Sequence, residues 1–246
     1  MKPSQLKAVL FDLDGTLVDT ADEFIVVVQA LRGEHGMDKM DPARIRRSVS
    51  NGARALVELG LGISPDEEVF ESKRLRLLEL YAGVLGTAAK PYPGIGPLLD
   101  ALEKRGVRWG VATNKPRAYA EPLLQNLGML PPAAAVEAGQ GREGHRDGNT
   151  ANGAYYCGSL VCPDDVKDRK PHPESLYLNC RELECSPHEA VYVGDHLRDV
   201  EAGRRAGMYT VAAAYGYIEP GDSPNSWGAD ALVNCSTELT DLILNL

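Results

Sequence analysis

The chain has 246 residues, a length that suits one large α/β domain or a core domain with a smaller one. Hydrophobic residues make up 43% of it and charged residues 25%, as in ordinary soluble globular proteins. The net charge of −9 disfavours binding to nucleic acid or to an anionic membrane surface. No apolar run approaches the roughly 18 residues of a membrane helix. We therefore expect neither a nucleic-acid partner nor a membrane partner.

Two features of the sequence favour a cytoplasmic protein. An expected strand begins within about eight residues of Met1, which leaves no room for a signal peptide. The five cysteines are an odd number, which suggests reduced thiols. We expect localisation in the cytoplasm.

The first stretch with chemical content runs from Val9 to Asp19. An apolar run, typical of a strand buried on both faces, ends in Asp12 and Asp14 just before a Gly-Thr pair. Two crowded carboxylates repel each other unless a cation or a shared proton compensates them, and hard oxygen ligands suit Mg²⁺. The alternative is a solvated turn, since Asp, Gly and Thr all favour turns.

Helical periodicity without a convincing strand follows this motif. The first helix is expected over Thr20–Arg32, with its first residue and Glu23 forming a capping box. Further helices are expected over Pro42–Val49, Ala53–Leu59 and Asp66–Val84. The simplest use of such an insertion is a cap domain. The expected boundaries are 19–90 for the cap, and 1–18 with 91–246 for the core.

Strands and helices then alternate along the rest of the chain. Strands are expected over Arg108–Thr113, Ser159–Cys162, Ala190–Val193, Met208–Ala214 and, at an edge, Ala231–Val233. Helices are expected over Ile95–Arg105, Pro116–Leu127, Pro173–Leu183 and Asp199–Ala206. This alternation predicts an α/β fold: a doubly wound parallel sheet with a Rossmann-like core and a small all-helical cap inserted after the first strand.

Residues 139–158 stand apart because they are rich in glycine, with Asn and Asp between the glycines. Such a stretch cannot bury enough apolar surface to order itself well. It connects a helix to the next strand, so it is expected at the amino-terminal edge of the sheet, opposite the edge where ligands bind. We expect a mobile insertion.

Polar side chains are expected at the carboxyl ends of the parallel strands. These ends share one edge of a sheet, so the groups can converge there. Taken singly, each could be a helix cap, a solvated lysine or a plain turn. Together, carboxylates with a hydroxyl, an amide and a lysine describe a metal-assisted phosphoryl site. The members are Asp12 and Asp14 after the first strand, Thr113 and Asn114 after the second, Lys170 after the third, and Asp195 with Asp199 after the fourth.

These residues resemble the four motifs of the haloacid dehalogenase-like hydrolase superfamily, and the helical insertion resembles its small α-helical cap class. The Thr-Asn-Lys and Lys-Pro-His-Pro-Glu sequences are similar to those of the phosphoglycolate phosphatase subgroup. The segments Tyr215–Ile218 and Trp227–Asp230 look closer still to the N-acetylmuramic acid 6-phosphate phosphatases. The resemblance covers nearly the whole chain apart from the glycine-rich insertion.

The resemblance implies a phosphatase that acts through an aspartyl-phosphate. Asp12 would attack phosphorus, Asp14 would serve as acid and then base, and Lys170 would neutralise charge. The remaining implied roles are Mg²⁺ binding by Asp12, Asp14, Asp195 and Asp199, and phosphate binding by Thr113, Asn114 and Gly15. One departure is His196, where many relatives carry a second aspartate, and this residue could shift the metal preference.

The substrate is expected to be a small phosphorylated metabolite, with N-acetylmuramic acid 6-phosphate first and 2-phosphoglycolate second. Both carry a carboxylate, which Arg54 in the candidate substrate loop Ser50–Arg54 could bind. The alternative for Arg54 is a solvated arginine at a helix start. Two other functions remain open, a sugar phosphomutase and a non-catalytic phosphometabolite-binding protein. We expect a monomer or a homodimer.

Overall fold

The computed structural model describes residues 2–131 and 156–246, and its centre is a parallel β-sheet. The sheet has six strands in the order β5-β4-β1-β6-β7-β8, and every neighbouring pair is parallel. This order confirms the predicted doubly wound α/β fold. Most of the predicted mobile insertion, residues 139–158, lies outside the described residues. The strands are β1 (Ala8–Phe11), β4 (Arg108–Ala112), β5 (Ser159–Val161), β6 (Ala190–Gly194), β7 (Tyr209–Ala213) and β8 (Ala231–Val233).

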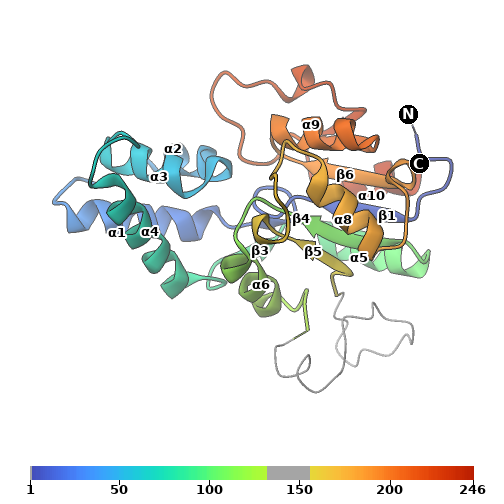
Figure 1. Ribbon diagram of the computed structural model, residues 1–246, viewed down its shortest axis with the longest axis horizontal. Helices are drawn as coiled ribbons and strands as arrows, with labels where there is room; N and C mark the ends of the chain where they lie inside the picture. Colours follow the sequence, from blue (N-terminus) through green and yellow to red (C-terminus); the bar gives the residue numbers. More distant parts are fainter. Residues whose placement is uncertain (1, 132–155) are drawn as a thin grey trace.

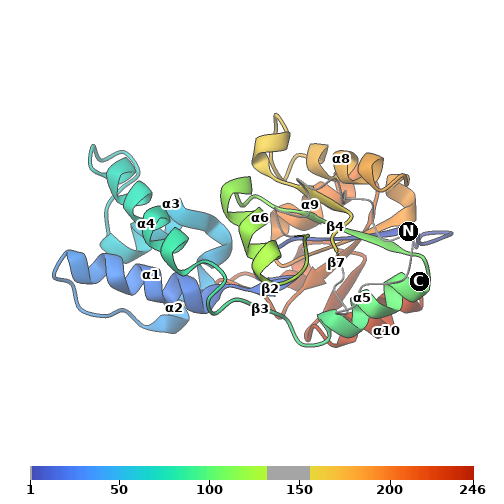
Figure 2. The same ribbon diagram turned by 90° about the horizontal axis from the view of Figure 1, so that it is seen from below.

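Helices cover both faces of this sheet, as Figure 2 shows. One face carries α5 (Ile95–Lys104), α6 (Arg117–Asn126) and α10 (Glu238–Leu244), and the other carries α8 (Glu174–Glu182) and α9 (Leu197–Ala206). Val9 and Phe11 of β1 join the apolar cluster on the first face. Ala8 and Leu10 join the cluster on the second. The apolar run of β1 is therefore buried on both faces, as predicted.

The segment between β1 and α5 folds as four helices beside the sheet (Figure 1). They are α1 (Ala21–Glu34), α2 (Pro42–Arg47), α3 (Gly52–Leu61) and α4 (Phe70–Val84). These helices pack around a cluster of their own that includes Phe24, Leu56 and Tyr81. The chain enters and leaves this helical insertion through two short antiparallel strands, β2 (Val18–Asp19) and β3 (Lys90–Pro91). Both chain termini lie at the opposite end of the molecule (Figure 1).

The capping box predicted at the start of α1 is wrong. Glu23 accepts hydrogen bonds from Ala88 N at 3.1 Å and Ala89 N at 3.0 Å, where the chain returns from α4. The hydroxyl of Thr20 donates to Asp14 at 2.6 Å. Both side chains of the expected box are thus taken by tertiary partners, which compete successfully with a local pattern.

Two helices start two or more residues away from their predicted starts, whereas the other differences amount to a single residue. Helix α4 begins at Phe70 rather than at Asp66, because turns occupy the preceding residues. Helix α9 begins at Leu197 rather than at Asp199. His196 caps α9, since its Nδ1 accepts a hydrogen bond from a backbone N–H of the first turn at 3.2 Å. A histidine at this position is not one of the usual capping residues, and this explains the missed boundary.

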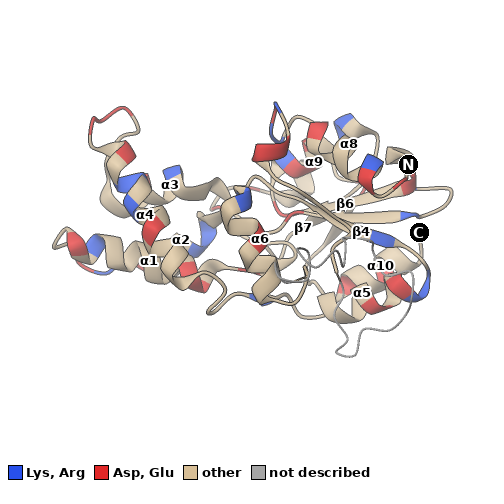
Figure 3. Ribbon diagram, turned by 60° about the horizontal axis from the view of Figure 1, so that its bottom comes forward, with Lys and Arg blue, Asp and Glu red and all other residues tan. Residues whose placement is uncertain are grey.

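Charged residues lie mainly on the helices, with both signs interspersed, whereas strands β4 and β6 are mostly uncharged (Figure 3). Within the described ranges, no helix combines the length and the apolar character needed to span a bilayer. Besides Glu23, whose carboxylate accepts two backbone hydrogen bonds, three acidic residues are buried in the described part of the chain: Asp12, Asp195 and Asp199 are only 6%, 1% and 0% exposed. Buried carboxylates need compensation, and these three mark the candidate site.

Candidate active site

The carboxyl ends of three neighbouring strands carry the predicted polar side chains. Asp12 follows β1, Thr113 follows β4 and Asp195 follows β6. Backbone pairing continues beyond the strands: Asp12 N donates to Val193 O at 2.9 Å, and Thr113 N donates to Val161 O at 3.0 Å. The sheet therefore fixes these residues along one edge, where open α/β sheets bind their ligands.

Three buried carboxylates meet at this edge. Asp12, Asp195 and Asp199 each offer an oxygen within 4.8 Å of the other two. Lys170 Nζ lies 2.9 Å from Asp12 Oδ1 and 2.8 Å from Asp199 Oδ1. One lysine among three carboxylates leaves an excess of negative charge, which a divalent cation would neutralise. A set of hard oxygen donors of this kind fits Mg²⁺.

The pKa values of the three carboxyl groups reflect this crowding. Burial raises the pKa of Asp12 to about 6, with repulsion from Asp199 adding to the shift and Lys170 opposing it. Burial and the charges of Asp12 and Asp199 raise the pKa of Asp195 to about 7. Burial also acts to raise the pKa of Asp199, but Lys170 and Arg198 outweigh it and the pKa is lowered. Asp12 and Asp195 are therefore the carboxyl groups that a bound cation would help to ionise.

Lys170 occupies a fixed place beside Asp12. Its Nζ also donates to Ala112 O at 2.7 Å and to the hydroxyl of Tyr192 at 2.8 Å. That hydroxyl in turn donates to Asp199 at 3.1 Å. Burial acts to lower the pKa of Lys170, but Asp12 and Asp199 outweigh it and the pKa is raised. The lysine thus remains a cation inside the site.

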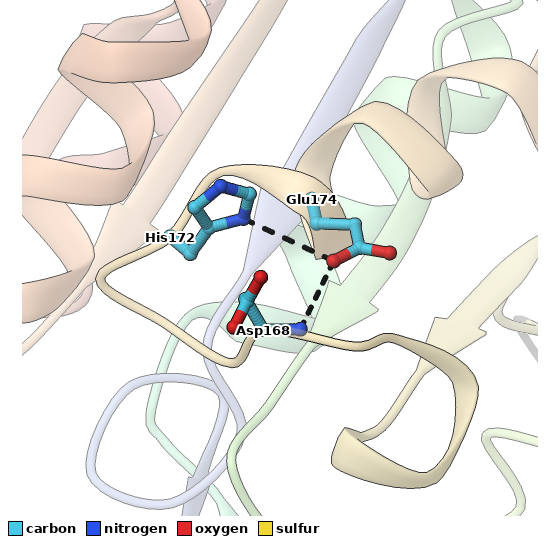
Figure 4. A group of neighbouring side chains, drawn as sticks. All are labelled: Asp168, His172 and Glu174. Carbon is cyan, nitrogen blue, oxygen red and sulfur yellow. Dashed lines mark hydrogen bonds and ion pairs between the residues drawn. The ribbon is translucent and has the colours of Figure 1, made fainter.

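A second group of candidate metal ligands lies on the loop that carries Lys170 and at the start of α8: Asp168, His172 and Glu174 (Figure 4). Unlike the buried carboxylates, Asp168 and His172 are exposed. The Glu174 carboxylate accepts a hydrogen bond from Asp168 N at 3.0 Å, and His172 Nδ1 lies 3.9 Å from it. These contacts brace the loop against the start of α8, so we assign no metal to this group.

Asp14 faces a different set of partners, at the border with the helical insertion. Thr20 Oγ1 donates to Asp14 Oδ1 at 2.6 Å, and Lys115 Nζ lies 3.0 Å from the same oxygen. The Lys115 side chain is 6% exposed and its Nζ lies 4.6 Å from the ring centroid of Tyr81. Sequence reasoning missed Lys115 as a site residue, although it directly follows the predicted pair Thr113–Asn114 and this position was a usable signal.

Gly15 leaves room for the Asp195 carboxylate. Its φ is +85°, and a Cβ on it would lie 2.1 Å from Asp195 Oδ2. The Asp195 oxygens accept hydrogen bonds from Thr16 Oγ1 at 3.2 Å, Tyr217 N at 2.9 Å and Ser50 Oγ at 2.9 Å. Ser50 belongs to the predicted substrate loop, but nothing in the sequence indicated that it reaches Asp195. Phosphate binding by Gly15 stays a prediction.

The other predicted phosphate and substrate residues have partners near them. Thr113 Oγ1 accepts a hydrogen bond from Lys115 N at 3.1 Å, and Asn114 Nδ2 donates to a backbone oxygen of the loop before α8 at 3.2 Å. Arg54 is exposed on α3, with its guanidinium 5.3 Å from the ring centroid of Phe70. The binding of phosphate by the first two, and of a carboxylate by Arg54, stays a prediction.

His196 lies next to the carboxylate group. Burial and the charge of Arg198 lower the pKa of His196 to about 4, so the ring is neutral at physiological pH. The ring lies 6.4 Å from that of Trp227, centroid to centroid. Trp227 itself is 4% exposed and packs against Val200 and Ala212. Helix capping and packing therefore account for both side chains.

Comparisons with known proteins identify similar sequences and structures. A family model described as haloacid dehalogenase-like hydrolase matches residues 6–207. An N-acetylmuramic acid 6-phosphate phosphatase of Pseudomonas aeruginosa is 44% identical over 99% of this chain and 97% of that protein. A phosphoglycolate phosphatase of Xanthomonas campestris is 36% identical over 95% of this chain and 94% of that protein. A crystal structure of a predicted phosphoglycolate phosphatase from Haemophilus somnus superposes with a TM-score of 0.76 at 20% identity, covering 98% and 99% of the two chains.

Proposed function

This chain belongs to the haloacid dehalogenase-like hydrolases, and on that basis we propose that it is a Mg²⁺-dependent phosphatase that acts through an aspartyl-phosphate. The observation that carries the proposal is the group of three buried carboxylates around Lys170 Nζ. With Asp14 two residues after Asp12, one edge of the sheet offers a nucleophile, a cation site and a proton donor. Phosphoryl transfer needs little more than such placement and electrostatic stabilisation.

Asp12 is the proposed nucleophile. One of its carboxylate oxygens forms a bond to phosphorus while the bond from phosphorus to the leaving alcohol breaks, which gives the aspartyl-phosphate. Lys170, 2.9 Å away, orients this carboxylate and offsets its charge. The groups that would hold Mg²⁺ are the side chains of Asp12, Asp195 and Asp199 and the backbone carbonyl of Asp14. A bound Mg²⁺ would offset the repulsion between two anions that must approach each other.

Asp14 is the proposed acid and base. It gives a proton to the leaving alcohol, and later takes one from the water that hydrolyses the aspartyl-phosphate. Thr113, Asn114 and Gly15 are the proposed phosphate ligands, because they lie at or beside the same strand ends as Asp12. Their hydroxyl, amide and backbone groups suit phosphate oxygens.

The proposed substrates are N-acetylmuramic acid 6-phosphate first and 2-phosphoglycolate second. The support is the similarity to the N-acetylmuramic acid 6-phosphate phosphatase of Pseudomonas aeruginosa, at 44% identity, and to the phosphoglycolate phosphatase of Xanthomonas campestris, at 36%. Both substrates carry a carboxylate, for which Arg54 is the proposed partner. We also propose that the helical insertion, bounded at residues 19–90, acts as a cap, because its Ser50 already contacts Asp195 at the sheet edge.

The test is phosphate release from a panel of phosphorylated metabolites with Mg²⁺, comparing wild type with Asp12→Asn. The panel contains the two proposed substrates and several hexose phosphates. Strong preference for one substrate, lost in the variant, would support both the chemistry and the substrate. An isomerised sugar phosphate without free phosphate would favour a phosphomutase instead. Saturable binding without turnover by the wild type would favour a non-catalytic binding protein.

A further inference from the structure

Lys115 connects Asp14 to the helical insertion. It follows β4 in the core, and its Nζ lies 3.0 Å from Asp14 Oδ1 and 3.3 Å from Oδ2. The same Nζ lies 5.1 Å from the ring centroid of Phe24 on α1 and 4.6 Å from that of Tyr81 on α4. The two rings stack on each other with their centroids 4.3 Å apart. One lysine thus contacts the proposed proton donor and two helices of the insertion.

Burying the charged ammonium group of Lys115 costs desolvation free energy that packing contacts alone do not offset. The Lys115 side chain is only 6% exposed, so its ammonium group is largely removed from water. An apolar side chain of the same length could fill the space against the rings without that cost. The Asp14 carboxylate, 3.0 Å from Lys115 Nζ, compensates this charge. The faces of Phe24 and Tyr81 offer this cation further compensation.

The Asp14 carboxylate is held from the side of the insertion. Thr20 Oγ1 donates to Asp14 Oδ1, the oxygen that Lys115 also reaches. Both donors direct the carboxylate towards the border between the sheet edge and the insertion. In phosphoryl transfer the leaving oxygen lies roughly in line with the attacking one and on the far side of phosphorus. A proton donor for the leaving group therefore belongs away from Asp12, and the contacts with Thr20 and Lys115 hold the Asp14 carboxylate at the border with the insertion.

We propose that Lys115 is a positioning residue that holds Asp14 for proton transfer to the leaving alcohol, while Phe24 and Tyr81 hold the lysine. The inference rests on the proposed phosphatase function and deepens it. As the bond from Asp12 to phosphorus forms and the bond to the leaving oxygen breaks, the proton of Asp14 passes to that oxygen. Lys115 gives and takes no proton, and its charge stabilises the carboxylate that Asp14 becomes in this step.

Leaving groups of different basicity separate this role from a merely structural one. An alkyl phosphate releases a strongly basic alkoxide and needs a proton donor, whereas p-nitrophenyl phosphate releases a stable phenolate and does not. The quantity to measure is kcat/KM, because it reports the steps up to departure of the leaving group. In contrast, kcat can be limited by hydrolysis of the aspartyl-phosphate, which both substrates share.

The experiment compares wild type, Lys115→Met and Asp14→Asn on p-nitrophenyl phosphate and on the alkyl ester that the wild type hydrolyses faster, N-acetylmuramic acid 6-phosphate or 2-phosphoglycolate. We expect Lys115→Met to lower kcat/KM for the alkyl ester at least about tenfold more than for the aryl ester, within the 10²–10⁴-fold that general acid catalysis supplies. Asp14→Asn should show the same selectivity with a larger loss. Lys104→Met, at an exposed lysine of α5, is the matched control and should leave kcat/KM unchanged for both the alkyl and the aryl ester.

Equal losses on both esters in Lys115→Met, or no loss on either, would overturn the inference. If Lys115→Met does not fold, as judged by near-ultraviolet circular dichroism, Lys115→Gln is measured in its place and the same selectivity is required. Lys115→Arg keeps the charge and should recover part of the alkyl activity. Absence of phosphate release from every ester by the wild type would contradict the proposed function itself, which is a different outcome from unselective loss in the variant.

Discussion

The hydroxyl of Tyr217 accepts a hydrogen bond from the backbone N–H of Thr20 at 2.7 Å. It accepts a second from Ala21 N at 3.0 Å and donates its own proton to Asp19 at 2.8 Å. A phenol has one donor and room for two acceptor contacts, so these three bonds satisfy it completely. The N–H groups at a helix start have no partner within the helix. A side chain from near the carboxyl terminus therefore caps α1, where the helical insertion begins.

Tyr217→Phe should lower the free energy of unfolding by about 1–2 kcal/mol, the usual cost of a lost helix cap, because the buried N–H of Thr20 loses its acceptor while Ala21 N keeps its bond to Asp19. The ring still fills its place, so the loss comes from the hydroxyl alone. Urea denaturation followed by far-ultraviolet circular dichroism measures it. Tyr177→Phe removes a hydroxyl from a 46% exposed tyrosine and should change the stability by less than about 0.5 kcal/mol. Equal changes in the two variants would show that the cap contributes nothing.

Local patterns in the sequence are enough to predict the sheet and the cluster of carboxylates at its edge. The apolar run of β1 has a clear length and ends abruptly at Asp12, and the chain alternates between strands and helices afterwards. A parallel sheet then brings the strand ends together whatever the details of packing. For this reason the sequence alone predicts that Asp12, Asp195 and Lys170 lie near one another, as they do in the structure.

The contacts between the core and the helical insertion could not be predicted in this way. Lys115 meets Asp14 across 101 positions of the chain, and Ser50 meets Asp195 across 145. Such pairs depend on how two packed units meet, which leaves no periodic trace in the sequence. The failure of the Glu23 capping box has the same origin, because its carboxylate found partners where the insertion ends.

Gly15→Ala should destabilise the protein by more than the backbone strain of a positive φ alone. A Cβ at Gly15 would lie 2.1 Å from Asp195 Oδ2, so the carboxylate or the turn must move. Gly62→Ala is the matched control, since its φ is also positive, at +69°, and a Cβ there would meet nothing within 4 Å. We expect a cost of about 1–2 kcal/mol for Gly62→Ala and a clearly larger one for Gly15→Ala. Similar melting temperatures for the two variants would contradict this explanation of Gly15.

Added Mg²⁺ should raise the melting temperature of the wild type, because an ion that binds only the folded state stabilises it in proportion to the logarithm of its concentration. Asp195→Asn removes one of the three buried carboxylates and should reduce this rise strongly. Asp168→Asn removes an exposed carboxylate of the second group and should leave the rise unchanged. Differential scanning fluorimetry over a Mg²⁺ series, started from protein treated with EDTA, measures all three. A rise lost in Asp168→Asn and kept in Asp195→Asn would move the metal to the second group.

Without metal, the buried carboxyl groups should make stability fall as the pH rises from about 4 to 7. Burial and neighbouring charges raise the pKa of Asp195 from 3.8 to about 7 in the folded protein. In this interval Asp195 keeps its proton in the folded state but has released it in the unfolded state. Its contribution to stability is therefore fully present below the pKa of the unfolded state, 3.8, and is lost as the pH rises through the pKa of the folded state, about 7. Asp12, with its pKa raised to about 6, acts in the same direction.

The measurement is the free energy of unfolding in EDTA at several pH values, for wild type and for Asp195→Asn. The difference isolates Asp195 from carboxyl groups of opposite behaviour, such as Asp199, whose pKa is lowered. We expect the wild type to lose more than about 1 kcal/mol relative to the variant between pH 4 and 7, since one pKa unit corresponds to about 1.4 kcal/mol. Saturating Mg²⁺ should abolish this loss, because a cation on the ionised carboxylates removes the penalty for releasing their protons. If the unfolding free energies of wild type and Asp195→Asn vary with pH in parallel in EDTA, Asp195 is already ionised and its charge is compensated within the protein.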